Sequence, residues 1–105
     1  AVARSGFEEL LRTYPTSQDA PEAMIYIAST YEQERNQAAA DSVYGLVVKQ
    51  YPKSPKAATA LYKRAQSMAG AGQTASARVM YNRIITEYPN SDEADLAKSR
   101  LRTLK

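Results

Sequence analysis

The 105-residue sequence predicts an all-α fold built from antiparallel helix pairs, with about six helices in total. A segment of the form Tyr-Pro-x-Ser-x-x-Ala begins at Tyr14, Tyr51 and Tyr88, in two steps of 37 residues (51 − 14 and 88 − 51). Apolar side chains recur at helical spacing on both sides of each copy. A period of about 20 to 50 residues is typical of repeats that bury their apolar faces only against neighbouring repeats.

The helix preceding each copy of the segment is predicted from apolar residues at positions i, i+3, i+4 and i+7, which share one helix face. These sets are Phe7, Leu10, Leu11 and Tyr14; Tyr44, Val47, Val48 and Tyr51; and Tyr81, Ile84, Ile85 and Tyr88. A second apolar face follows each copy, formed by Ala20, Met24, Ile27, Ala28 and Tyr31; by Ala57, Leu61, Ala65 and Met68; and by Ala94, Leu101 and Leu104. Each repeat is therefore predicted to be a pair of helices.

The repeated segment itself is predicted to end one helix and start the next. Proline has no N–H and disfavours helical geometry in the residue before it, so we expect helices to stop ahead of Pro15, Pro52 and Pro89. The serines of the segment can cap the following helix, and acidic residues or proline in its first turn suit the helix dipole. These residues are Ser17, Ser54 and Ser91, followed by Asp19, Pro55, Asp92 and Glu93. The turns inside the repeats are expected at residues 34–37 and 70–73.

These elements predict a single domain over residues 1–105. Residues 1–14 form the second helix of a truncated repeat, residues 17–51 and 54–88 form two complete repeats, and residues 91–105 form a C-terminal capping helix. Ala3 lies 37 residues before Ala40, so the chain is expected to open inside a repeat whose leading helix is missing, as in a truncated or proteolysed product.

The pattern of large, small and aromatic residues resembles the tetratricopeptide repeat family. The residues that carry the resemblance are Met24, Ile27, Ala28, Tyr31, Ala40, Tyr44, Val47 and Pro52, and then Leu61, Arg64, Ala65, Met68, Ala77, Tyr81, Ile84 and Pro89. The family implies a right-handed superhelix of helix pairs. Arg64 stands where the family has an apolar residue and Arg35 where it has glycine, and the period exceeds the usual 34 residues.

The longer period and phrases such as YPKSPKAATALYKRAQSMAGAG resemble, over nearly the whole chain, the C-terminal repeat domain of the YbgF/CpoB family of the Tol-Pal system. That resemblance implies a periplasmic scaffold that contacts the TolA protein and links envelope constriction during cell division to cell-wall synthesis. Lipoproteins resembling the BamD assembly factor use similar segments. A structural or assembly module of an outer-membrane lipoprotein, or a self-associating repeat domain, is therefore the alternative.

Composition argues against enzymatic chemistry and against several kinds of ligand. The sequence has no His and no Cys, which removes the usual bases, nucleophiles and zinc ligands, and we expect no cofactor, no metal and no catalytic residue. Residues 1–42 carry three Arg against seven Asp/Glu, whereas residues 43–105 carry eleven Lys/Arg against four Asp/Glu. The basic residues never form a run, which argues against nucleic acid as a partner. No apolar stretch approaches the roughly 20 residues that span a bilayer, so no direct membrane insertion is expected.

In a superhelix of this type the leading helix of each repeat lines the concave side, which is the usual binding surface of helical repeat proteins. We expect the residues that follow each packing residue of a leading helix by one or two positions to face this groove. The candidates are Glu22, Ile25, Tyr26, Ser29 and Gln33 from the first leading helix; Thr59, Tyr62, Lys63 and Gln66 from the second; and Ser99, Arg100 and Thr103 from the third.

Two tyrosines, Tyr26 and Tyr62, lie off the packing stripe, and Tyr62 beside Lys63 is expected to be an exposed interface anchor. Some family members clamp a C-terminal carboxylate with Lys and Asn on these helices. The matching positions here hold Ile25 and Ser29, Tyr62 and Gln66, and Ser99 and Thr103, so this clamp does not carry over. A partner in this groove should present apolar and hydrogen-bonding groups with some acidic character, to suit Lys63 and Arg100.

Overall fold

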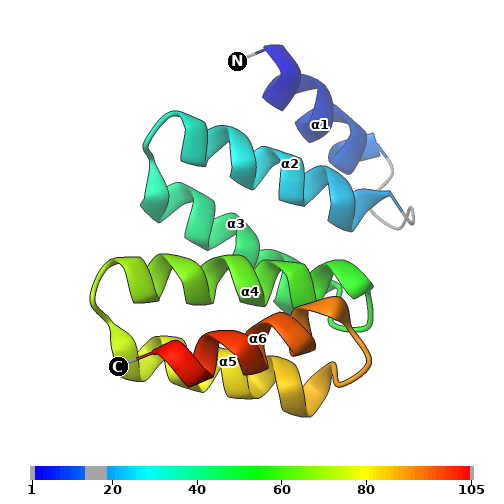
Figure 1. Cartoon of the computed structure of the whole chain (residues 1–105). Helices are drawn as coiled ribbons and strands as arrows, with labels where there is room; N and C mark the ends of the chain where they lie inside the picture. The colour runs from blue at the N-terminus through cyan, green and yellow to red at the C-terminus, as the bar shows by residue number, and fades with distance from the viewer. Residues whose placement is uncertain (1, 14–18, 105) are drawn as a thin grey trace. The chain divides into compact units, whose positions relative to one another are not determined.

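The computed structural model describes residues 2–13 and 19–104, and within these ranges it contains six α-helices and no strand (Figure 1). The helices are α1 (Val2–Thr13), α2 (Ala20–Gln33), α3 (Gln37–Gln50), α4 (Pro55–Gly70), α5 (Thr74–Glu87) and α6 (Asp92–Thr103). The prediction of an all-α fold with about six helices is confirmed. The chain divides into two compact units, Ala1–Ala57 and Ala58–Lys105, so that α4 begins in the first unit and lies mostly in the second.

In the first unit α1 packs against α2, and α2 packs against α3 (Figure 1). The predicted apolar faces are the buried ones, since Met24 and Ile27 of α2 and Tyr44 and Val47 of α3 are almost inaccessible to solvent. The buried hydroxyl of Tyr44 donates a hydrogen bond of 2.6 Å to the Glu32 carboxylate, so its polar group is satisfied inside the unit. Burial raises the pKa of Tyr44, which therefore stays a neutral donor.

The second unit consists of most of α4 together with α5 and α6. Leu61 and Ala65 of α4, Tyr81 and Ile84 of α5, and Ala97 of α6 are buried, and α5 packs against α6. Arg64, which departs from the family pattern, does not interrupt α4, a continuous helix of 16 residues. Its side chain is half-buried, and its Nε has no hydrogen-bond partner among the described residues.

The last two copies of the repeated segment adopt the same backbone geometry. Tyr51 has φ −130° and ψ 55° and Tyr88 has φ −131° and ψ 56°, both outside the helical region, as expected for a residue before proline. The Tyr51 N–H still donates to the Val47 carbonyl at 2.9 Å, and the Tyr88 N–H donates to the Ile84 carbonyl at 2.8 Å. The predicted helix ends are confirmed at both positions, whereas residues 14–18 of the first copy lie outside the described residues.

Two of the three predicted serine caps can be examined. The Ser91 hydroxyl accepts a hydrogen bond from the Ala94 N–H at 3.0 Å, and the Ser54 hydroxyl accepts one from the Lys56 N–H at 3.1 Å. The third serine, Ser17, lies outside the described residues. The N-cap residue of α2 is Asp19, which makes no side-chain capping bond, and proline stands in the first turn of that helix.

The turns inside the two repeats share one backbone feature. Arg35 has φ 62° and Gly72 has φ 81°, and these residues are one period of 37 apart. In both turns the next N–H reaches back five residues, from Asn36 to the Tyr31 carbonyl and from Gln73 to the Met68 carbonyl, at 2.8 Å each. This is the helix-ending geometry in which a left-handed residue closes the last turn. Arg35 adopts the same type of turn as the glycine in spite of its side chain.

We predict that Arg35→Gly stabilises the protein by up to about 1 kcal/mol, because glycine removes the cost of a side chain at positive φ. Gly72→Ala should destabilise it by about 1 kcal/mol. Gly70→Ala is the matched control, since Gly70 is helical and an added Cβ would meet nothing within 4 Å. That control should stabilise the protein by about 0.4–1 kcal/mol. Urea denaturation measures all three, and destabilisation by Arg35→Gly would contradict this account.

A second prediction concerns the core of α5. Ile84 is fully buried, so Ile84→Ala should lower the free energy of unfolding by about 2–5 kcal/mol through lost burial and a residual cavity. Val79 lies on the same helix but is 68% exposed, and Val79→Ala should change stability by no more than about 0.5 kcal/mol. Equal effects of the two substitutions in chemical denaturation would show that the α5 face is assigned wrongly.

Candidate functional site

The strongest candidate site lies in the second unit, where α4, α5 and α6 meet around two tyrosines and an arginine. The Arg100 Nε–H of α6 donates a hydrogen bond of 3.2 Å to the Tyr62 hydroxyl of α4. The ring of Tyr62 lies 5.9 Å from that of Tyr81 on α5, with an interplanar angle of 59°. A tilted pair at this distance is a favourable aromatic arrangement. The Tyr62 ring therefore packs into the unit while its hydroxyl holds the Arg100 side chain.

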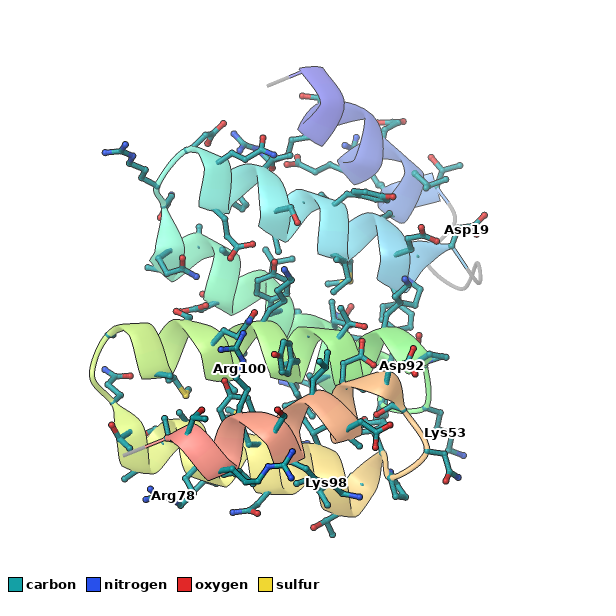
Figure 2. All side chains as sticks on the ribbon, in the orientation of Figure 1. Asp19, Lys53, Arg78, Asp92, Lys98 and Arg100 are labelled. Carbon is teal, nitrogen blue, oxygen red and sulfur yellow. The ribbon has the colours of Figure 1, made fainter. Side chains whose placement is uncertain are left out.

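A second hydrogen bond fixes the register of α6 against α4. The Thr59 hydroxyl, one turn before Tyr62, donates to the Glu93 carboxylate at 2.6 Å. Glu93 lies in the first turn of α6, where the positive end of the helix dipole favours a carboxylate. Figure 2 shows Arg100 on the side of α6 nearer α4, and Lys98 on the opposite side. The two hydrogen bonds hold α6 at two points about two helical turns apart.

Beside these contacts is a pocket of about 360 Å³. Its lining residues are Gln66, Ala69, Gly70, Tyr81, Arg100, Thr103 and Leu104. Three of them, Gln66, Arg100 and Thr103, are among the predicted groove residues, so the structure brings together side chains that are far apart in the sequence. Together they offer a guanidinium, an amide and a hydroxyl over an apolar floor, which suits hydrogen-bonding and anionic groups.

Among the described residues that line this pocket, Arg100 alone is charged. Its side chain is exposed, and among residues 2–13 and 19–104 no carboxylate forms an ion pair with it. The hydrogen bond with Tyr62 is the main cause that raises the pKa of Arg100, so the guanidinium is cationic at any physiological pH. Burial raises the pKa of Tyr81, which keeps that phenol neutral. Within the described residues, the pocket therefore has one positive charge without a carboxylate partner.

Two of the predicted residues of the first unit line a different, smaller pocket. Glu22 and Tyr26 of α2 line a space of about 240 Å³ together with Leu10, Asp19 and Ala23. Tyr26 is 49% exposed, as expected for a tyrosine off the packing stripe. Ile25 and Ser29 are half-buried and Gln33 is exposed, and none of these three lines that pocket.

The expectation that Tyr62 is an exposed anchor is wrong. Only 8% of Tyr62 is accessible to solvent, because its ring packs against Tyr81 and Arg100 engages its hydroxyl. Lys63 is half-buried, Thr59 is engaged with Glu93, and Ser99 is exposed without lining the pocket. Of the predicted second and third sets, Gln66, Arg100 and Thr103 therefore line the pocket, and the Thr103 hydroxyl, which donates to the Arg100 carbonyl at 3.1 Å, can still accept a hydrogen bond from a partner.

Sequence reasoning missed the apolar part of the pocket. Ala69 and Gly70 are the last residues of α4, Tyr81 was predicted only as core, and Leu104 follows α6. Small residues at the end of a leading helix leave room beside it, and this is the one signal in the sequence that indicates a cavity there.

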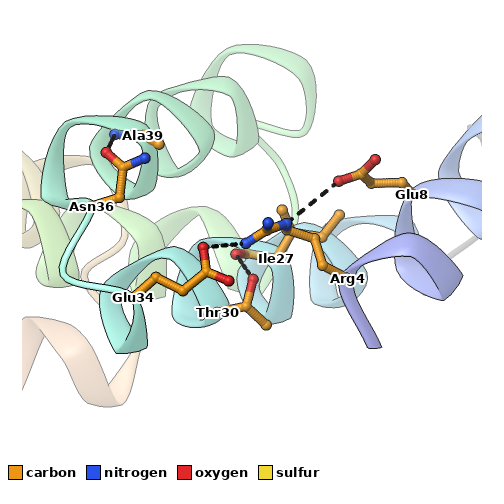
Figure 3. Close-up of polar contacts among 7 residues, drawn as sticks. All are labelled: Arg4, Glu8, Ile27, Thr30, Glu34, Asn36 and Ala39. Carbon is orange, nitrogen blue, oxygen red and sulfur yellow. Dashed lines mark hydrogen bonds and ion pairs between the residues drawn. The ribbon is translucent and has the colours of Figure 1, made fainter. Parts of the chain in front are cut away.

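The first unit contains a comparable arginine whose charge is already compensated. Arg4 of α1 lies 4.3 Å from the centre of the Tyr31 ring and forms a 2.8 Å ion pair with Glu34 at the end of α2 (Figure 3). A longer contact of 3.8 Å joins it to Glu8 on its own helix. The hydrogen bond from Arg4 is the main cause that lowers the pKa of Glu34. These contacts fasten α1 to α2.

Two properties of the described residues bear on other functions. Within the described ranges, no group of three or more Asp or Glu side chains is placed to hold a metal ion. Among the helices described, none combines the length and the hydropathy that a membrane crossing requires.

The geometry defines a helical repeat protein, with two copies of one helix pair carrying the same helix ends and turns. The family model described as tetratricopeptide repeat matches residues 22–54 and 59–91, one match within each unit. The chain belongs to the tetratricopeptide repeat family, whose members are generally non-enzymatic protein-interaction scaffolds, and this indicates a protein-interaction module. No curated protein matches the chain closely enough to count as a relative.

The Arg4–Glu34 contact predicts a pH dependence. A carboxyl group whose pKa is lower in the folded state than its unfolded value near 4.5 stabilises the fold above that value, and loses this contribution as the pH falls through the folded pKa. Glu34→Gln should therefore lower the Tm at pH 7 and reduce the loss of Tm on acidification, so that the two curves converge as the pH falls through the folded pKa of Glu34.

The control for this experiment is Glu9→Gln. Glu9 pairs with Arg12 at 3.0 Å, but the two side chains are 65% and 72% exposed. Exposed pairs contribute little, so this variant should follow the wild-type Tm at pH 7 closely. Parallel curves for the wild type and Glu34→Gln across the acid range would rule out the contact as the cause.

Proposed function

We propose that the chain is a non-enzymatic scaffold that binds a protein partner on its leading helices, chiefly on the α4–α6 surface of the second unit. The observation that carries the proposal is the pocket of about 360 Å³ at which Gln66, Arg100 and Thr103 meet. Helical repeat proteins use such surfaces for extended segments or small domains of their partners. Within the first unit, the predicted groove residues of α2, with the exposed Tyr26, form a separate candidate surface.

We further propose a setting in the bacterial envelope. The support is the resemblance of the repeated segments beginning at Tyr14, Tyr51 and Tyr88 to those of the YbgF/CpoB family. On this proposal the protein is periplasmic, its partner is a TolA-like envelope protein, and it takes part in Tol-Pal coordination of envelope constriction during division.

The alternative is a structural role, as a module of a BamD-like lipoprotein or as a self-associating domain. It is favoured by large apolar side chains that remain open to solvent in the second unit, where Val79 is 68% and Leu96 is 48% exposed. Light scattering over a range of concentrations distinguishes the two proposals. A mass that grows with concentration, and returns to the monomer value in Val79→Ser with Leu96→Ser, would favour self-association.

The test of the proposed function measures binding to the purified periplasmic part of the TolA-type protein encoded in the same genome. The double variant Gln66→Ala with Thr103→Ala should weaken binding roughly tenfold, because it removes two hydrogen-bonding groups at the interface. The matched control, Ser76→Ala with Asn82→Ala, removes two exposed polar side chains of α5 outside the pocket and should leave the Kd unchanged. Binding that is equally strong in both double variants would refute the α4–α6 surface, and absence of binding by the wild type would refute the TolA-like partner.

A further inference from the structure

The α4–α6 pocket has a chemical preference that follows from its charge and shape. Of the described residues that line it, Arg100 alone is charged, and its Nε–H donates to the Tyr62 hydroxyl. With the Nε direction occupied, the terminal amino groups of the guanidinium remain as donors. A planar pair of donors is the arrangement that matches the two oxygens of a carboxylate.

The whole second unit favours an acidic partner. Residues 58–104 hold seven Lys/Arg and four Asp/Glu, a difference of +3. Two of these four carboxylates already have partners, since Glu87 pairs with Arg83 at 2.9 Å and Glu93 accepts the Thr59 hydrogen bond. The positive charge of this unit therefore attracts segments that carry acidic residues.

An apolar contact point lies one helical turn from Arg100. Leu96 precedes Arg100 by four residues on α6, so the two side chains share a helix face, and Leu96 is 48% exposed. Four residues of helix advance about 6 Å along the axis. In an extended segment, alternate side chains point to one side at a spacing of about 6.6 Å. An apolar and an acidic side chain two positions apart can therefore reach Leu96 and Arg100 together.

This face of α6 continues past Arg100 to Thr103, which also lines the pocket. A partner segment that lies along this face of α6 contacts the helix both before and after the residue that carries the carboxylate. An aspartate or glutamate inside a chain fulfils this condition, whereas a carboxylate at the end of a chain reaches only one side. The single guanidinium also matches the single charge of a carboxylate side chain.

We propose that this pocket binds an aspartate or glutamate side chain of an extended partner segment, with an apolar side chain two positions away resting on Leu96. Tyr62 acts as a positioning residue that orients the guanidinium through its hydroxyl. The inference rests on the proposed function, because it takes the partner to be a protein that docks on the α4–α6 surface.

The test uses short synthetic peptides and the full chain, so that it does not depend on the identity of the natural partner. The first peptide is a hexapeptide with both ends blocked, containing one leucine and one glutamate two positions apart among glycine and serine. The second has glutamine in place of glutamate. The third lacks glutamate and instead ends in a free carboxylate two positions from the leucine. Binding is measured by NMR titration, following the side-chain N–H signals of Arg100 and Gln66.

We expect the glutamate peptide to bind and to shift the Arg100 Nε–H signal, and the glutamine peptide to bind at least about tenfold more weakly. Arg100→Ala should weaken binding of the glutamate peptide by a similar factor, and Arg100→Lys should recover only part of it because the paired donors are lost. Tyr62→Phe removes the hydroxyl alone and should weaken binding a few-fold while leaving the circular dichroism spectrum and the Tm nearly unchanged. The control is Lys98→Ala, an exposed cation about 200° around α6 from Arg100, which should change the Kd by less than twofold (Figure 2).

Four results would overturn the proposal: no binding of the glutamate peptide, equal binding of the glutamine peptide, equal losses in Arg100→Ala and Lys98→Ala, or tighter binding of the peptide with the free end. The last result would assign the pocket to the C-terminal carboxylates of partner chains.

The outcome of this test is also separable from the outcome of the test of the proposed function. If the peptides fail while the TolA-type protein still depends on Gln66 and Thr103, the surface is retained and only its carboxylate preference is lost. If the peptides bind while that protein does not, the pocket is retained and the envelope partner is lost.

Discussion

The structure depends on the close approach of helices whose buried faces are made largely of alanine. Of the twenty hydrophobic residues that are buried among those whose side chains the structure describes, eleven are Ala, and most of these are fully inaccessible to solvent. An alanine face offers little area by itself, so it contributes to stability only when a neighbouring helix lies directly against it. A few large residues, led by Tyr44 and Tyr81, fill the remaining spaces. This constraint explains why the helix ends are fixed so closely by Pro52, Pro89 and the caps that follow them, since a helix of another length would move its alanine face out of contact.

The use of tyrosine as filling material has a chemical consequence. A buried phenol brings a hydroxyl that must find a hydrogen-bond partner, and the two units solve this requirement differently. In the first unit Tyr44 donates to Glu32, so the polar group is satisfied by an acceptor at 2.6 Å. In the second unit Tyr62 accepts from Arg100, so its oxygen is satisfied by a cation. Packing of the second unit therefore places a positive charge at the edge of a pocket, and the proposed binding chemistry follows from the way that the core is filled.

The helices, their ends and their buried faces could be predicted because each is encoded locally. Proline, the serine caps and the apolar periodicity act within one or two turns, and the spacing of 37 residues repeats them. The error at Tyr62 has a different origin. Tyr62 corresponds to Ile25 one period earlier and Tyr26 corresponds to Lys63, so the two tyrosines occupy adjacent positions on equivalent helices and differ by about 100° in direction. The periodicity could not show that Tyr81 would stand beside Tyr62, or that α4 would end in small residues next to Leu104, because these contacts join residues from three helices.

The contrast between Arg4 and Arg100 explains why one arginine is structural and the other is a candidate for recognition. Both guanidinium groups contact a tyrosine, Arg4 through the ring of Tyr31 and Arg100 through the hydroxyl of Tyr62. Arg4 also has Glu34 at 2.8 Å and Glu8 at 3.8 Å, so a third carboxylate would gain little from binding there. Arg100 has no such pair within the residues described, yet its direction is already fixed by Tyr62. A cation that is oriented but not neutralised loses little conformational freedom when an anion arrives, and this combination makes the α4–α6 pocket, rather than the α1–α2 contact, the favoured place for an acidic side chain.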